Sequence, residues 1–347
     1  MRASIRTLGA WAVMAAVAAC GGSTPPPVET GGSLPPPHDT PPDTSSLPSG
    51  PEPANTAELT AGIKAFDAGS YADARKSFEA ASKKDPKNYE ALFDLGQACE
   101  KLGDKPAALT AYKAALAVKP DLDTAAAALS SIYIDAGQND DALAVAKAGL
   151  ASHPGSAALH ENMGIALATR GDQAPATLEL EAAIKAQPTE PTFHLVFAHW
   201  LNVWHVRGAA PHLDAVRDSA KDDYALLVTV GYEYRLAAEF DSCVKLFDRL
   251  IATKDGGEVR TDRALCKLGL KDEKGMLADL QAAVAKEPTY AVAHYWLGGR
   301  LATTKHFKEA AAEYAKYLEL APTGSLVRAA TEKLKMAQEA AKAPKKK

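Results

Sequence analysis

Nine histidines give this 347-residue chain its main potential for metal chemistry. Two histidines that share a metal on one helix face need a spacing of four residues, as in His-Glu-x-x-His. The segment 193–212 is rich in histidine, but its gaps are five, six and seven residues, between His194, His199, His205 and His212. His160, His194 and His294 instead recur at one position of the sequence repeat described below, which indicates a structural role. The sequence therefore predicts no metal site and no cofactor.

A serine and a lysine match a nucleophile motif by letter. Ser242 and Lys245 have the S-x-x-K spacing of a serine nucleophile beside a lysine. Enzymes with this motif also carry S-D-N and K-T-G elements, and the sequence contains neither. No G-x-S-x-G turn, glycine-rich phosphate loop or pair of catalytic carboxylates stands out. We therefore expect a protein that is not an enzyme and that has no small-molecule substrate.

The four cysteines lack the spacing of a redox or zinc motif, because no C-x-x-C is present. Cys99, Cys243 and Cys266 fall on the apolar stripes of predicted helices, where free cysteine is commonly buried. A disulfide between Cys243 and Cys266 is compatible with their positions in neighbouring repeats. The sequence leaves open whether they pair.

Proline recurs every 34 residues, at Pro86, Pro120, Pro154 and Pro188, and again from Pro288 to Pro322. Within 89–122, apolar residues follow helical spacing up to Gly103 and again before Pro120. Two such stripes, divided by a glycine and closed by a proline, predict a helix–turn–helix unit. Small residues twelve positions apart, such as Gly96 and Ala108, predict close contact between its two helices. One helix pair cannot bury its apolar face alone, so neighbouring pairs should stack.

This pattern resembles the tetratricopeptide repeat (TPR) family. The last repeat shows the family's residues well, in Leu297, Gly298, Ala310, Tyr314 and Pro322. The resemblance implies an all-α superhelical solenoid of about eight helix–turn–helix repeats over 55–324, then a capping helix and basic tail over 325–347. The repeats are expected at 55–88, 89–122, 123–156, 157–190, 191–223, 224–256, 257–290 and 291–324. The fifth to seventh are degenerate, and the fifth and sixth are one residue short and lack the closing proline.

The N-terminal sequence indicates where the protein is located in the cell. Arg2 and Arg6 precede an apolar run over 8–19 that is too short to span a membrane and fits a signal peptide. The run ends in Val-Ala-Ala-Cys-Gly at 17–21, which resembles the bacterial lipobox. The resemblance implies a signal peptide at 1–19 and a lipidated Cys20; the alternative is an ordinary signal peptide cleaved near residue 19. Glycine rather than aspartate at position 21 favours the outer membrane.

The segment 20–54 is expected to be a disordered tether. Its residues 21–54 contain eleven prolines and no lysine or arginine, so the segment cannot bury a core. The formal net charge of the chain is −4, which disfavours nucleic acid as a partner. The membrane is therefore expected to be reached through the lipid anchor only.

The family resemblance also implies a binding surface. In TPR proteins the first helix of each repeat lines a concave groove that binds protein partners. Here the corresponding positions include Phe93, Gln97, His199, Asn202, Tyr232, Arg235 and Tyr295. These residues make the groove mildly apolar and aromatic, which suits an extended or helical protein segment.

Together these expectations describe a non-catalytic, membrane-anchored scaffold in the bacterial cell envelope, most simply at the outer membrane facing the periplasm. Lipoproteins of this layout resemble the pilotins of type IV pilus secretins and outer-membrane assembly or motility factors. We therefore expect it to assist the assembly or stabilisation of an envelope complex. The alternative is an accessory regulator of an enzyme of cell-wall or polysaccharide synthesis.

Overall fold

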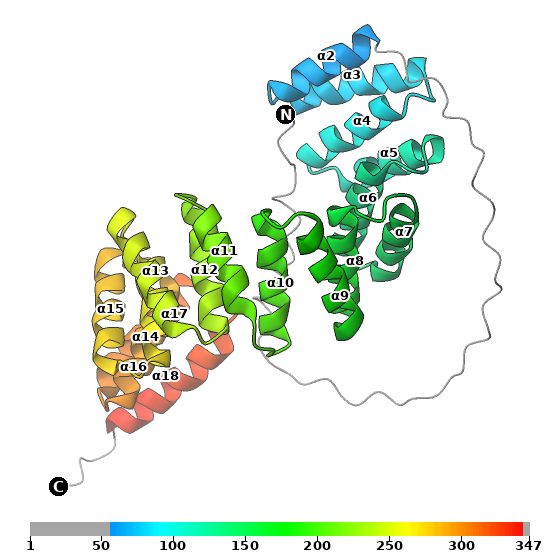
Figure 1. The fold of residues 1–347 in the computed structure, drawn as a ribbon. Coiled ribbons are helices and arrows are strands. Elements are labelled where there is room, and N and C mark those ends of the chain that lie inside the picture. The colour runs from blue at the N-terminus through cyan, green and yellow to red at the C-terminus, as the bar shows by residue number, and fades with distance from the viewer. Residues whose placement is uncertain (1–55, 343–347) are drawn as a thin grey trace, which may run out of the picture. The chain divides into compact units, whose positions relative to one another are not determined.

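The computed structural model describes residues 56–342, which form seventeen α-helices and no β-strand (Figure 1). The predicted signal peptide 1–19, the lipidation site Cys20 and the whole predicted tether lie outside the described residues. Within the described part, no helix has both the length and the apolar character that a membrane span requires.

Sixteen helices form eight hairpin pairs, and a final helix follows them. The pairs are α2 (Ala57–Asp67) with α3 (Tyr71–Lys84), α4 (Tyr89–Lys101) with α5 (Lys105–Val118), α6 (Asp123–Asp135) with α7 (Asn139–Ser152), α8 (Ala157–Arg170) with α9 (Gln173–Ala186), α10 (Pro191–Val203) with α11 (Ala209–Ser219), α12 (Tyr224–Leu236) with α13 (Phe240–Thr253), α14 (Gly257–Gly269) with α15 (Glu273–Lys286), and α16 (Ala291–Thr303) with α17 (Phe307–Leu320). The final helix α18 (Val327–Lys342) packs against α17. The predicted all-α class and repeat number are confirmed.

The chain divides into two compact units. Unit 1 is Met1–Ala186, whose described helices are α2–α9, and unit 2 is Gln187–Lys347, whose described helices are α10–α18. Each unit has its own apolar core. Tyr112 and Tyr133 lie in a core cluster of unit 1, and Tyr314 and Tyr317 lie in one of unit 2.

In five of the eight pairs the two helices approach closely because the first helix carries a glycine at the contact. At Gly96, an added Cβ would lie 2.5 Å from the ring of Tyr112. Ala108 is fully buried, as its pairing with Gly96 predicted. The ring sixteen residues after the glycine, rather than the alanine, occupies the space that a side chain at position 96 would need.

The turns inside the pairs differ between the units. In unit 1 the left-handed turn residue is always glycine, with φ between 71° and 90°, at Gly69, Gly103, Gly137 and Gly171. In unit 2 the equivalent residues are His205, Ala238, Lys271 and Lys305, with φ between 55° and 65°. A side chain in this region costs roughly 1–2 kcal/mol per residue. Unit 2 therefore keeps the same turn geometry without glycine, the residue that adopts it at the lowest energetic cost.

The first helices of the pairs form an inner row in unit 2. Each of α10, α12 and α14 contacts the first helix of the next pair, whereas the second helices make no comparable contact with one another. In a stack that bends, the row whose members touch lies on the shorter, inner side. The predicted groove residues of unit 2 all belong to this inner row.

Candidate functional site

In unit 1, α2 contacts α4 and α6 contacts α8, so we use the term inner row for the first helices of this unit as well. Its helix α4 holds two of the predicted groove residues. Phe93 and Gln97 lie one turn apart on α4 and are both half-buried. The centre of the Phe93 ring lies 5.6 Å from the centre of the Tyr112 ring, so the Phe93 ring packs against the core. Tyr112 also donates a hydrogen bond to the carboxyl group of Glu100, while burial raises the pKa of that carboxyl. The side chains of Phe93 and Gln97 are therefore partly exposed on a helix that packs against the core.

In unit 2, His199 and Asn202 meet at a buried carboxylate that joins α10 to α12. His199 Nδ1 donates to Glu233 Oε1 at 2.8 Å, and Asn202 Nδ2 donates to Glu233 Oε2 at 2.8 Å. Asn202 Nδ2 also lies 3.0 Å from the backbone oxygen of Glu233. The three residues are only 5%, 8% and 1% exposed, which leaves His199 and Asn202 little surface for a partner.

One atom of this network is unsatisfied: His199 Nε2 is buried and makes no hydrogen bond to the described residues. The sequence interpretation did not include Glu233. Its only signal is one acidic residue in the last turn of the mostly apolar helix YALLVTVGYEYRL.

Tyr232 and Arg235 lie on the next part of the inner row, and both are partly exposed. The guanidinium carbon of Arg235 lies 4.8 Å from the centre of the Tyr232 ring, within the range of a cation–π contact. No hydrogen bond or ion pair joins the Arg235 side chain to another described residue, and its Nε is buried without a partner. Burial raises the pKa of the nearby Asp262 carboxyl to about 6, although the Arg235 charge acts in the opposite direction.

Tyr295 belongs to the core of the last pair rather than to an open surface. It is 6% exposed, and its ring lies 5.9 Å from Tyr314 and 5.6 Å from Tyr317. Lys333 of α18 lies 4.6 Å from the ring centre. The final helix therefore covers this part of the inner row.

Three histidines share one structural arrangement. The imidazole Nε2 donates to the backbone oxygen of the proline that closes the preceding repeat, and Nδ1 faces a side chain of the second helix of its own pair. The partners are Pro154 and Glu179 at His160, Pro188 and His212 at His194, and Pro288 and Glu313 at His294. The shared position thus serves to join repeats. Among residues 56–342, no group of three or more potential ligands could hold a metal ion.

Cys243 and Cys266 form a disulfide that connects α13 to α14, with their Cα atoms 6.0 Å apart. The sequence had left this pairing open. Cys99 is a free, buried thiol, and burial raises its pKa.

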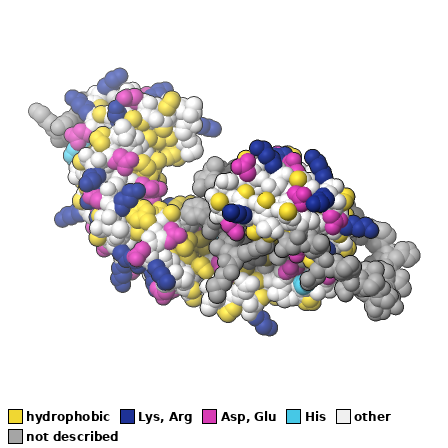
Figure 2. Space-filling model, turned by 90° about the horizontal axis from the view of Figure 1, so that it is seen from above, with side chains coloured by type: hydrophobic (Ala, Val, Ile, Leu, Met, Phe, Trp, Pro, Cys, Tyr) yellow, Lys and Arg dark blue, Asp and Glu magenta, His cyan; other side chains and the backbone are white. Residues whose placement is uncertain are grey.

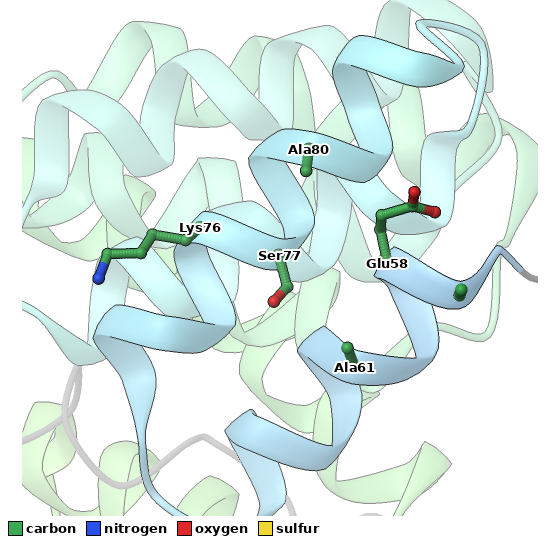
Figure 3. A pocket seen from close by; sticks show the side chains of 6 residues that line it. Glu58, Ala61, Lys76, Ser77 and Ala80 are labelled. Atoms are coloured by element: carbon green, nitrogen blue, oxygen red, sulfur yellow. The ribbon is translucent and has the colours of Figure 1, made fainter.

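The first pair carries a shallow hollow on its outer side, and Figure 3 shows its lining. Small side chains form its floor, with Glu58 and Lys76 at the sides. The lining residues are Ala57, Glu58, Ala61, Lys76, Ser77 and Ala80. This set offers neither a nucleophile with a base nor a phosphate-binding loop. On the face drawn in Figure 2, acidic and basic side chains are interspersed, with hydrophobic patches between them.

The repeats can now be compared with known proteins. The tetratricopeptide repeat family model matches residues 59–127, 127–191 and 277–325, which together are more than half of the chain. This chain belongs to the tetratricopeptide repeat family. TPR proteins bind other proteins through their repeats, which is the coarse function this membership supports. No curated protein is similar to this chain in sequence.

Solved structures share the TPR fold. The crystal structure of PilW, described as a widely conserved type IV pilus biogenesis factor, matches with a TM-score of 0.51 and 20% identity, over 56% of this chain and 91% of PilW. A TPR protein from Parabacteroides merdae matches with a TM-score of 0.43 and 17% identity, over 81% of this chain and 97% of that one.

The TPR family model does not match residues 192–276. That stretch holds the buried Glu233 network, the unpaired Arg235 and three of the four non-glycine turns. It is where this TPR protein departs most from its family's pattern.

Proposed function

We propose that this TPR protein is a non-catalytic scaffold, held in the bacterial cell envelope by a lipid on Cys20, that helps to assemble or stabilise an envelope complex. The observation that carries the scaffold is the array of eight helix pairs, whose inner-row helices present partly exposed side chains such as Phe93, Gln97 and Tyr232. The anchor rests on the lipobox-like sequence at 17–21. The fold shared with PilW makes a role in pilus or outer-membrane assembly our preferred form of the proposal.

The anchor is tested by fractionating cells that produce the full chain or its Cys20→Ser variant. We expect the wild-type protein in the outer-membrane fraction, extracted only by detergent. The variant should become soluble or accumulate as the uncleaved precursor, because it lacks the residue that carries the acyl chains. A mature variant that stays in the membrane fraction would exclude Cys20 as the anchor.

The scaffold role is tested by photo-crosslinking in intact cells. A photoreactive amino acid is placed at Gln97 or at Tyr232 on the inner row, and at Leu178 on α9 as the control. Leu178 is 67% exposed, so it is at least as accessible as the inner positions. We expect covalent adducts with an envelope protein from an inner position and none from Leu178. Secretin or pilus subunits in the adduct would support an assembly role, whereas a cell-wall or polysaccharide synthase would favour the regulator.

A further inference from the structure

The inner-row helices of the two units end in different types of side chain. In unit 1 the last residue of every inner-row helix is charged: Asp67, Lys101, Asp135 and Arg170. In unit 2, α10 and α12 end instead with the apolar side chains of Val203 and Leu236, and on α14 Leu268 precedes the last residue, Gly269. We call these three residues the unit 2 ridge.

The ridge is exposed to solvent. Val203, Leu236 and Leu268 are 37%, 42% and 45% exposed, and they are among the few large apolar side chains with this much exposure. Isolated exposed leucines are normal on a protein surface. Val203 and Leu236 are the last residues of α10 and α12, Leu268 is one position before the last residue of α14, and these helices contact one another in order. We therefore treat the three as one apolar strip, of the kind that marks a binding surface.

One cation lies beside this strip and has no ion-pair or hydrogen-bond partner among residues 56–342. Arg235 precedes Leu236 directly, and the Tyr232 ring packs against its guanidinium group. Arg235 forms no ion pair with Asp262 of α14, although its charge acts to lower the pKa of that carboxyl. The Nε of Arg235 is buried, but its terminal nitrogens make no hydrogen bond to a described residue, and a carboxylate matches them in charge and in planar geometry.

We propose that the unit 2 ridge and Arg235 bind an apolar segment of a partner protein that carries a side-chain carboxylate. Apolar side chains of the segment cover Val203, Leu236 and Leu268, and its carboxylate accepts hydrogen bonds from Arg235. This inference rests on the proposed scaffold function and names the chemistry of its partner. A lipid surface fits less well, because the ridge residues belong to the inner-row helices of the stack.

The test selects ligands without assuming a partner. A phage-displayed library of random 16-residue peptides is selected on the full chain in detergent, and a selected peptide is synthesised with each of its acidic residues as found or as the amide. Binding is measured by fluorescence anisotropy. We expect the selected peptides to combine several large apolar residues with at least one aspartate or glutamate. Changing that residue to its amide should weaken binding about tenfold or more, because a hydrogen bond to a charged group contributes at least that factor.

Variants of the chain locate the contact. Arg235→Gln should weaken binding of the acidic peptide by about tenfold or more and leave binding of the amide peptide unchanged, which would show that Arg235 contacts the acidic side chain directly. Leu236→Ser should weaken binding of both peptides. The controls make the same changes at exposed residues elsewhere, Arg328→Gln on α18 and Leu178→Ser on α9, and should have no effect.

Two outcomes overturn the inference. Peptides that bind with equal affinity to wild type, Arg235→Gln and Leu236→Ser contact another surface. A wild-type chain that self-associates in sedimentation, and that Leu236→Ser converts to a monomer, uses the ridge for a second copy of itself. Neither outcome affects the Cys20 fractionation, which decides the anchor independently.

Discussion

Glu233 is the residue whose replacement tests the structure of the inner row most directly. Its carboxylate is 1% exposed and accepts hydrogen bonds from His199 Nδ1 and Asn202 Nδ2, both of them also buried. Glu233→Ala leaves both donors unpaired at about 1–3 kcal/mol each and removes buried methylenes, so we expect a loss of about 3–5 kcal/mol in the free energy of unfolding. Glu233→Gln keeps the shape but turns an amide N–H toward one donor, which should cost about 1–3 kcal/mol.

The measurement is urea unfolding followed by circular dichroism, with hydrogen exchange of α10 and α12 as a local readout. Glu239→Gln is the matched control, because it makes the same charge change at an exposed residue that begins α13 without a side-chain cap. Surface substitutions of this kind usually change stability by less than about 0.5 kcal/mol. If Glu233→Gln behaves like this control and α10 exchanges no faster, the carboxylate does not hold the two helices together and the reasoning is wrong.

Two further predictions concern the turns and pH. Ala238→Gly should raise the free energy of unfolding by roughly 0.5–1 kcal/mol, because glycine adopts the φ of 59° without strain. The control Ala215→Gly, within α11, should lower it by about 1 kcal/mol. The midpoints of urea unfolding measure both changes, and a destabilised Ala238→Gly variant would show that the turn is not strained. Asp262 has a pKa raised to about 6, so the folded wild-type protein loses stability as the pH rises from about 4 to 6. Above pH 6 the Asp262→Asn variant should therefore be more stable than the wild type, by at most about 3 kcal/mol. Below pH 4 it should show no such gain. Parallel stability curves from pH 4 to 8 would contradict this.

The sequence was sufficient for the fold because its signals are local. Gly103 ends the first helix of its repeat and Pro120 follows the second, so turn and closure could both be read within 34 residues. The same reasoning remains valid in the fifth repeat, where the glycine is absent. His205 takes the left-handed conformation that glycine takes elsewhere, because packing of the pair fixes the turn. Tertiary contacts override the local preference there.

The site was less predictable because its contacts join residues about one repeat apart. His199 and Asn202 lie on the inner-row helix α10, but their exposure depends on residue 233, which lies 34 and 31 positions later. Helical periodicity describes one helix at a time and contains no information about which side chain of the next helix reaches across. The same limit applies to Tyr295, whose cover comes from α18.

Unit 2 departs from the repeat pattern in two respects, and both fall in the same stretch of the sequence. Its turns use His205, Ala238 and Lys271 instead of glycine, and three of its inner-row helices carry an exposed apolar side chain at or next to their last residue. Neither departure helps the repeats to stack, and a side chain in the left-handed region costs stability. In a chain whose local and global preferences otherwise agree, such violations are expected to concentrate where a surface serves binding rather than folding. Unit 1 follows the glycine rule at every turn, so the difference between the units is itself an argument for placing the partner contact on unit 2.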